Sequence, residues 1–230
     1  DVEGEAYDYP EYFFQKRVHR ISRVSAAKEE VQDLADALSK SKKPLIVVGG
    51  GVKYSEAGEA VEAFCKEFNI PFGETQAGKS ACKSSDAYCL GGIGVTGTLA
   101  ANRIAKEADT VLAIGSRLSD FTTGSKWLFR EEGVQVLTIN NNRYHAYKMD
   151  AIKAVGDAKA TLEELAKALR EKNYRSAYKG EIESCKAEWD KEYNRLAEYA
   201  YKEEGFEPLV PERDPRTIPE FVEKTKGYLT

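Results

Sequence analysis

Short apolar runs and amphipathic stretches alternate along most of the chain. The apolar runs are rich in Val, Ile and Leu, as expected of buried strands, and lie at residues 45–48, 70–72, 110–114, 134–139 and 152–155. Between them, apolar residues recur every three or four positions, as on one face of a helix, at residues 31–38, 60–68, 99–105 and 162–169. This alternation predicts a doubly wound, mainly parallel α/β domain, which we place at residues 26–172.

The segments on either side of this domain differ from it in composition. Residues 1–25 are aromatic and lack a clean period, which predicts an extended segment pinned by its rings. Apolar residues from Ile182 to Leu196 step by three and four, which predicts one long helix within residues 173–204; it either flanks the domain or contacts another one. Four of the seven prolines fall between residues 208 and 219, so we expect residues 205–230 to be a linker. The acidic start and this ending lead us to expect a piece of a longer protein.

Composition narrows the class of protein. Hydrophobic residues at 42% and charged residues at 31% are ordinary for a globular chain. Lys and Arg number 34 against 38 Asp and Glu, a net charge of −4, so there is no basic excess for a nucleic acid. No apolar run approaches the roughly 20 residues that would span a membrane. The four cysteines lack Cys-x-x-Cys spacing, which argues against a zinc site, and two histidines leave little material for a His-dependent nucleophile. We expect the cysteines to be free thiols, which is typical of a cytoplasmic protein.

The segment Gly73–Ser80 has the spacing of a phosphate-binding loop. In such a loop, backbone N–H groups surround the phosphates, Lys79 would reach the terminal phosphate and Ser80 would bind magnesium. A helix has to begin directly after the loop, and the residues after Ser80 show no helical apolar period. We therefore interpret Lys79 as a structural residue or a contact to a neighbouring domain.

Two further motifs suggest a ligand cleft. Gly92–Gly97 is a G-x-G-x-x-G run that precedes a helix capped by Thr96 or Thr98. The residues before it make a poor strand, whereas the dinucleotide-binding motif requires a strand there. Its glycines therefore either make a tight turn or let an anion approach the helix N-terminus. Gly115–Asp120 lies past the carboxyl end of a strand, where open α/β sheets bind ligands. There, Arg117 and Asp120 either hold phosphate and hydroxyl groups or pair with each other or with a neighbouring domain. The candidate cleft residues are Gly50, Gly94, Thr96, Gly97, Arg117, Asp120 and Asn140.

Three segments, at residues 91–102, 108–120 and 156–162, resemble in order and spacing the central domain of thiamine-diphosphate enzymes such as acetolactate synthase. Residues 1–10, 49–57, 74–79 and 120–127 are more similar still to a family of hydrolases that open the ring of trihydroxycyclohexane-1,2-dione in myo-inositol breakdown. The resemblance covers essentially the whole chain. It implies a Rossmann-like domain between a pyrimidine-binding and a pyrophosphate-binding domain of the same chain, in a homo-oligomeric parent that uses thiamine diphosphate and Mg²⁺.

The chain departs from the family pattern at two sets of residues. The catalytic glutamate and the Gly-Asp-Gly motif for magnesium and diphosphate belong to the two other domains, and Gly-Asp-Gly occurs nowhere in this sequence. Flavin-binding relatives carry His where this chain has Thr96, a second Arg where it has Phe121, and aspartates where it has Asn140 and Asn142. Arg117 is the flavin contact that is retained, so we expect a formed but flavin-free, vestigial nucleotide cleft.

The sequence thus predicts the central domain of a thiamine-diphosphate-dependent carbon–carbon hydrolase, which supplies a scaffold and a cleft wall. The resemblance implies that this part of the protein has no catalytic residue, no metal ligand and no cofactor of its own. Two alternatives remain open: the flavin-binding central domain of an acetolactate-synthase-like carboligase, and a free-standing nucleotide-binding module. We expect no nucleic-acid or membrane partner for any of them.

Overall fold

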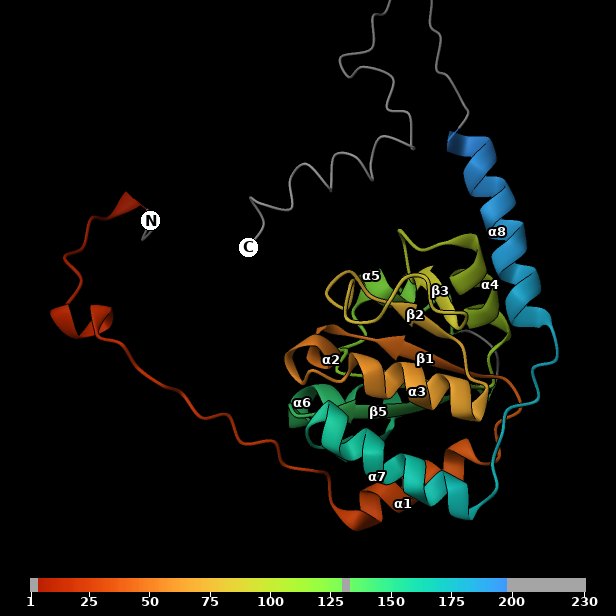
Figure 1. The fold of residues 1–230 in the computed structure, drawn as a ribbon, viewed down its shortest axis with the longest axis horizontal. Helices are drawn as coiled ribbons and strands as arrows, with labels where there is room; N and C mark the ends of the chain where they lie inside the picture. Colours follow the sequence, from red (N-terminus) through yellow and green to blue (C-terminus); the bar gives the residue numbers. More distant parts are fainter. Residues whose placement is uncertain (1–3, 130–132, 198–230) are drawn as a thin grey trace, which may run out of the picture.

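The computed structural model describes residues 4–129 and 133–197. Within them, the strands form one all-parallel, six-stranded sheet in the order β3-β2-β1-β4-β5-β6 (Figure 1). The strands are β1 (Pro44–Val48), β2 (Phe72–Glu74), β3 (Cys89–Gly92), β4 (Thr110–Ile114), β5 (Gln135–Asn140) and β6 (Ile152–Val155). The predicted doubly wound α/β fold is confirmed.

Helices cover both faces of the sheet. One face is covered by α1 (Lys28–Leu38), α3 (Gly58–Phe68) and α7 (Ala158–Glu171), and the other by α4 (Leu99–Glu107) and α8 (Glu181–Ala197). Each strand therefore contributes to two cores: in β1, Ile46 and Val48 pack with the first set of helices, and Leu45 and Val47 with the second. Burial on both faces explains why the strands are continuous apolar runs.

The order of the strands creates a crevice in the middle of the sheet. From β1 the chain winds outward through β2 to β3, then returns to β4 on the other side of β1 and continues to β6. The connections after β1 and β4 therefore diverge, and open α/β sheets bind ligands at such a point of reversal. Short helices follow three of the strands at this edge: α2 (Gly50–Tyr54), α5 (Asp120–Thr123) and α6 (Arg143–Ala146).

Glycine backbones lie against each other at the point of reversal. Gly49 N donates to Ile114 O at 2.8 Å, and Gly51 N donates to Gly115 O at 3.0 Å. Gly115 has a φ of +61°, and a Cβ added to it would lie 2.5 Å from the Cα of Gly51. Side chains at these positions would force the ends of β1 and β4 apart.

Several local expectations needed correction. The segment at residues 86–91, interpreted from the sequence as a poor strand, contributes to the edge strand β3 (Cys89–Gly92), which leads into the glycine turn. The turn after β1 continues into α2, and the strand expected at residues 70–72 begins at Phe72. The long helix is confirmed as α8, which packs on α4, whereas the expected linker at residues 205–230 lies outside the described residues.

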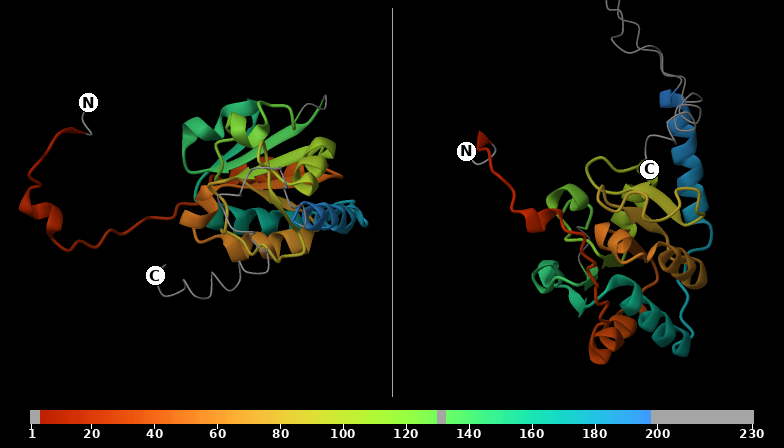
Figure 2. Two further views of the ribbon diagram at one scale, coloured as in Figure 1. Left: turned by 90° about the horizontal axis from the view of Figure 1, so that it is seen from above. Right: turned by 60° about the vertical axis from the view of Figure 1, so that its left-hand side comes forward.

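The N-terminal arm, which we define as residues 4–22, is extended as expected but is not pinned by its rings. It contains one short turn of 3-10 helix (Glu11–Phe14) and runs away from the domain (Figure 2). Its rings contact one another, with Tyr9 and Phe13 5.8 Å apart between centroids, and they stay exposed. The aromatic pattern therefore identified an exposed arm, and the expectation of a docked one was wrong.

We expect Gly115→Ala to destabilise the domain more than Gly133→Ala does. Both positions have positive φ, which costs an alanine about 1–2 kcal/mol, but only Gly115 is crowded by neighbouring backbone. Overpacking adds about 1–3 kcal/mol at Gly115. Urea denaturation of both variants measures the difference, and equal losses would show that the contact between β1 and β4 is not a stabilising constraint.

Candidate ligand cleft at the carboxyl edge of the sheet

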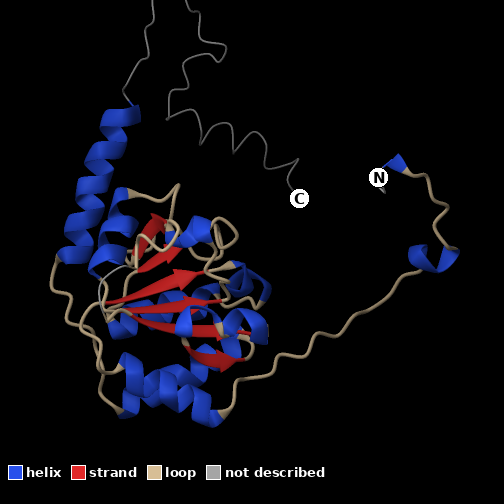
Figure 3. Cartoon of the chain, turned by 180° about the vertical axis from the view of Figure 1, so that it is seen from behind, coloured by secondary structure: helices blue, strands red, loops and turns tan. Residues whose placement is uncertain are grey.

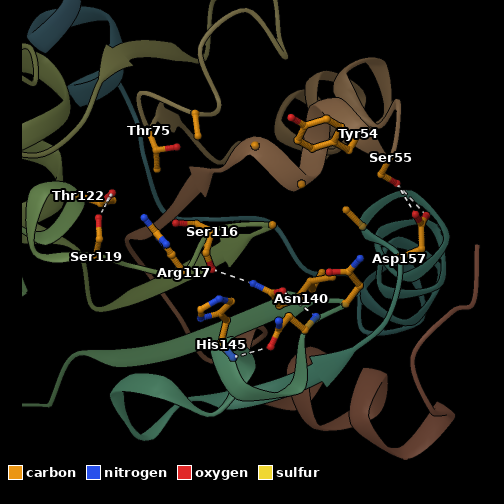
Figure 4. Close-up of a pocket in the computed structure, with 18 of the residues that line it drawn as sticks. Tyr54, Ser55, Thr75, Ser116, Arg117, Ser119, Thr122, Asn140, His145 and Asp157 are labelled. Atoms are coloured by element: carbon orange, nitrogen blue, oxygen red, sulfur yellow. Dashed lines mark hydrogen bonds between the residues drawn. The ribbon is translucent and has the colours of Figure 1, made fainter. Parts of the chain in front are cut away.

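A cleft of about 1160 Å³ opens where the strands end (Figure 4). Figure 3 shows the strands all pointing toward this side of the domain. The residues that line it lie at the ends of all six strands or at the base of the arm: 21–24, 50–51, 54–55, 75–77, 115–117, 119–122, 139–142 and 155–158, with Ile93, Thr96 and His145.

Five of the seven candidate residues line this cleft: Gly50, Thr96, Arg117, Asp120 and Asn140. Gly94 and Gly97 do not line it and instead shape the turn before α4. Gly94 has a φ of +106°, and the side chain of Asn102 both accepts from its N–H at 3.0 Å and donates to its carbonyl at 2.9 Å. Thr98, one of the two predicted caps, is the N-cap of α4 and accepts from Ala101 N at 3.1 Å.

The side chain of Asn140 serves the fold. It is buried at the end of β5, its Nδ2 donates to Ser116 O at 3.0 Å and its Oδ1 accepts from Asn142 N at 2.9 Å. The amide thus joins the end of β5 to the loop after β4. A carboxylate at this position would have no hydrogen to donate to the Ser116 carbonyl, so an amide is the residue type that this contact requires.

The side chain of Arg117, unlike that of Asn140, is not used by the fold. Its neighbours hold the loop: Ser116 Oγ accepts from Leu118 N at 3.2 Å, and Leu118 is buried in the core although its φ is +45°. A non-glycine residue in this conformation costs about 1–3 kcal/mol and persists because its surroundings fix it. Arg117 itself is exposed on the cleft wall and makes no side-chain hydrogen bond or ion pair within the described residues. The cleft therefore presents a guanidinium that is available to an anion.

Asp157 and its polar partners Ser55 and Arg23 also line the cleft. Asp157 caps α7 by accepting from Ala160 N at 3.1 Å, and it also accepts from Ser55 Oγ at 2.8 Å and pairs with Arg23 at 3.3 Å. Burial raises the pKa of Asp157, but these three partners outweigh burial and hold the pKa below its ordinary value. Because the folded-state pKa is lowered, this stabilisation is present at neutral pH and is lost as the pH falls through that pKa.

Lys79 pairs with a buried carboxylate and does not belong to a phosphate loop. Its Nζ lies 3.3 Å from Oε2 of Glu74, a fully buried carboxylate at the end of β2, and 3.1 Å from Ser84 Oγ. Turns, and no helix, follow Ser80. The prediction that no helix receives phosphates here is confirmed, and the structural role expected for Lys79 has a definite partner.

Some residues of the cleft were missed in the sequence. Tyr54, Ser55, Thr75, Gln76 and His145 all line it. The Nδ1 of His145 is buried without a hydrogen-bond partner in the described part of the chain. Each of these residues follows the end of β1, β2 or β5, so a strand-end rule applied to every strand would have found them.

The described residues offer no cluster of side chains suited to a metal ion. Across residues 4–129 and 133–197, no three His, Cys, Asp or Glu side chains gather as they would around a metal ion. The four cysteines are free and buried, and burial raises the pKa of the Cys82 thiol to about 12, which keeps it protonated. The same part of the chain has no helix that is both long and apolar enough to cross a bilayer.

An all-parallel, doubly wound sheet with a cleft at its point of reversal places this protein in the class of Rossmann-like α/β domains. Residues 31–165 match the family described as thiamine pyrophosphate enzyme, central domain, and the chain belongs to that family. The resemblance found in the sequence is thereby confirmed at the level of the family.

Curated relatives match the chain over its whole length. They include proteins named 3D-(3,5/4)-trihydroxycyclohexane-1,2-dione hydrolase from Clostridium perfringens, 54% identical, from Clostridium botulinum, 52% identical, and from Bacillus thuringiensis, 49% identical. Each alignment covers 230 residues, which is 100% of this chain and 36% of the relative. The chain therefore spans about a third of the length of these relatives.

We expect Asn140→Asp to lower the free energy of unfolding by about 1–3 kcal/mol at neutral pH, because a buried acceptor loses its donor and faces a carboxylate. Asn141→Asp is the matched control, since Asn141 is exposed and makes no side-chain hydrogen bond within the described residues. Urea denaturation measures both variants. A loss no larger than that of the control would show that Asn140 does not tie β5 to the loop after β4.

Proposed function

We propose that this chain is the central domain of a thiamine-diphosphate-dependent hydrolase that cleaves a carbon–carbon bond to open the ring of trihydroxycyclohexane-1,2-dione in inositol breakdown. The observation that carries the proposal is the 49–54% identity along all 230 residues to relatives that bear the name of that hydrolase. Its cytoplasmic location is part of the same proposal.

In this proposal the chain supplies a scaffold and a cleft wall, and the chemistry belongs to other domains. Residues 26–172 are the central domain, residues 173–204 a flanking helix, and residues 1–25 and 205–230 linkers to a pyrimidine-binding and a pyrophosphate-binding domain. Those domains would hold thiamine diphosphate and Mg²⁺ in a homo-oligomeric enzyme. This division of roles rests on the resemblance, which assigns the catalytic glutamate and the Gly-Asp-Gly motif to the other two domains.

The cleft takes part in this proposal as a nucleotide site that no longer binds flavin. A flavin dinucleotide needs acceptors for its ribose hydroxyls at the next strand end, and charge-assisted hydrogen bonds to a carboxylate are about twice as strong as neutral ones. The strand end at β5 carries Asn140 and Asn142, and the amide of Asn140 is already used by the fold. Arg117, Asp120, Thr96 and Gly50 remain candidates for a weakly bound nucleotide.

Domain exchange tests the hydrolase assignment. The aligned 230 residues of the Clostridium perfringens relative are replaced by this chain, and consumption of the dione is measured after thiamine diphosphate binding has been verified. We expect a kcat within about tenfold of the parent, a barrier change below about 1.4 kcal/mol. The relative with its own segment re-inserted is the control. A chimera that folds and binds thiamine diphosphate but leaves the dione intact would overturn the assignment.

Cofactor analysis tests the division of roles. The purified chain is expected to be colourless, with no flavin absorbance and none released on denaturation, because the contacts for flavin are incomplete. Calorimetry with thiamine diphosphate and Mg²⁺ is expected to show no micromolar binding, because this chain lacks the ligands for both. A yellow protein would favour the acetolactate-synthase-like alternative, and tight binding of thiamine diphosphate would overturn the assigned domain roles.

A further inference from the structure

Among the described residues, the charged side chains of the cleft leave one cation and one anion unpaired. The Arg and Asp residues that line it are Arg23, Arg117, Asp120 and Asp157, and none of the described Lys or Glu residues does. Arg23 and Asp157 pair with each other at 3.3 Å. Arg117 and Asp120 follow β4, are exposed, and make no ion pair within the described part of the chain. A ligand therefore meets one guanidinium and one carboxylate, which together carry no net charge.

This balance of charge favours an anion with a single negative charge. A carboxylate carries one, and its two oxygens match the planar fork of a guanidinium in a bidentate pair. A diphosphate carries several, and the cation available to it here stands three residues from the carboxylate of Asp120. Like charges brought close together oppose binding. Arg117 and Asp120 together therefore suit a monocarboxylate better than a diphosphate.

The cleft also offers rings and hydrogen-bonding groups that carry no charge. Tyr54, 83% exposed, and Phe121, 53% exposed, line it with aromatic side chains. Ser119 Oγ and Thr122 Oγ1 lie 3.5 Å apart, and each hydroxyl can both donate and accept. The amide of Asn141 makes no side-chain hydrogen bond within the described residues. Such a lining suits a ligand with several hydroxyl groups, because each of them also donates and accepts.

These groups lie in one space. Arg117 extends from the loop after β4 into the cleft, Ser119 and Thr122 lie on the same side, and Tyr54 lies across from them (Figure 4). The backbone that carries Arg117 is held by the buried Leu118. The cation is thus fixed in position, and the uncharged groups surround it.

We propose that the cleft binds a polyhydroxylated monocarboxylate. Arg117 holds the carboxylate in a bidentate pair. Asp120 accepts a hydrogen bond from a hydroxyl group of the same ligand, and Asn141 and Ser119 bind further hydroxyl groups. The ring of Tyr54 or Phe121 packs on the carbon skeleton between them. This assigns to the cleft a ligand class that needs neither flavin contacts nor a diphosphate site.

The product of the proposed hydrolase belongs to this class, an identification that rests on the proposed function. Hydrolysis of the bond between the two adjacent carbonyl carbons of the dione gives one of them the OH of water and the other the H. The first carbon becomes a carboxylic acid, which ionises at neutral pH, and the second becomes an aldehyde, so no oxidant is needed. The three hydroxyl groups remain. The central domain thus binds the trihydroxy acid that the parent enzyme releases.

Calorimetric titration of the purified chain tests the ligand class. D-glucuronate, a six-carbon acid with one carboxylate and several hydroxyl groups, is the probe, and we expect a Kd below about 1 mM. The matched ligand is myo-inositol, which has the hydroxyl groups and no carboxylate, and it is expected to bind at least about tenfold more weakly because it cannot pair with Arg117.

Two arginine variants make the result specific to the cleft. Arg117→Gln is expected to lower the affinity for D-glucuronate at least about tenfold, since a charge-assisted bidentate pair is lost. Arg143→Gln is the matched control, because Arg143 is exposed and does not line the cleft, and its affinity is expected to stay within about twofold of the unchanged chain. Circular dichroism verifies that both variants fold.

Three outcomes would overturn the proposal: no binding of D-glucuronate, equal losses in the two arginine variants, or tighter binding of ADP than of D-glucuronate, which would indicate a nucleotide site. The domain exchange described above separates this result from the hydrolase assignment. An active chimera without D-glucuronate binding would retain the assignment and remove the ligand. D-glucuronate binding with an inactive chimera would retain the ligand class and remove its identification with the product.

Discussion

The structure depends on the close approach of two backbone segments that have no side chains. Gly49 and Gly51 after β1 lie against Gly115 after β4, with hydrogen bonds of 2.8 and 3.0 Å between the segments. Because nothing projects between them, the two central strands stay paired up to their carboxyl ends, and the chain can then turn away in opposite directions. The cleft exists because those directions diverge, so one steric constraint sets both the centre of the sheet and the site above it.

Some polar residues around the cleft hold its walls together, whereas Arg117 makes no such contact within the described residues. Asn140 joins β5 to the loop after β4, Asp157 caps α7 and pairs with Arg23 at the base of the arm, and Glu74 at the end of β2 pairs with Lys79. Arg117 faces the cleft without a partner in the described residues, on a loop held by the buried Leu118. Arg117 is thus a cationic position on the wall of the cleft, on a loop whose backbone is fixed by its neighbours.

Much of the fold could be predicted because its signals are local. The apolar runs at 45–48 and 110–114 and the helical period at 162–169 each depend on neighbouring residues, and all three were found correctly. The strand β3 was missed because its four residues include two glycines, and only pairing with β2 makes that segment a strand. The phosphate-loop spacing at Gly73–Ser80 was correctly rejected, because the residues that follow do not support a helix.

The sequence by itself determined the class of fold, the family and the strand ends at which a cleft would form, because periodicity and short motifs are written in consecutive residues. Only the tertiary structure decided what each polar side chain does there. From the sequence, Asn140 could bind a ligand or stabilise the fold. In the structure its side chain donates to the carbonyl of Ser116, 24 positions away in sequence, and so it stabilises the fold. The aromatic arm was expected to be docked, but its rings contact one another and Arg17 and stay exposed. Both outcomes depend on contacts between distant residues, which no local pattern encodes.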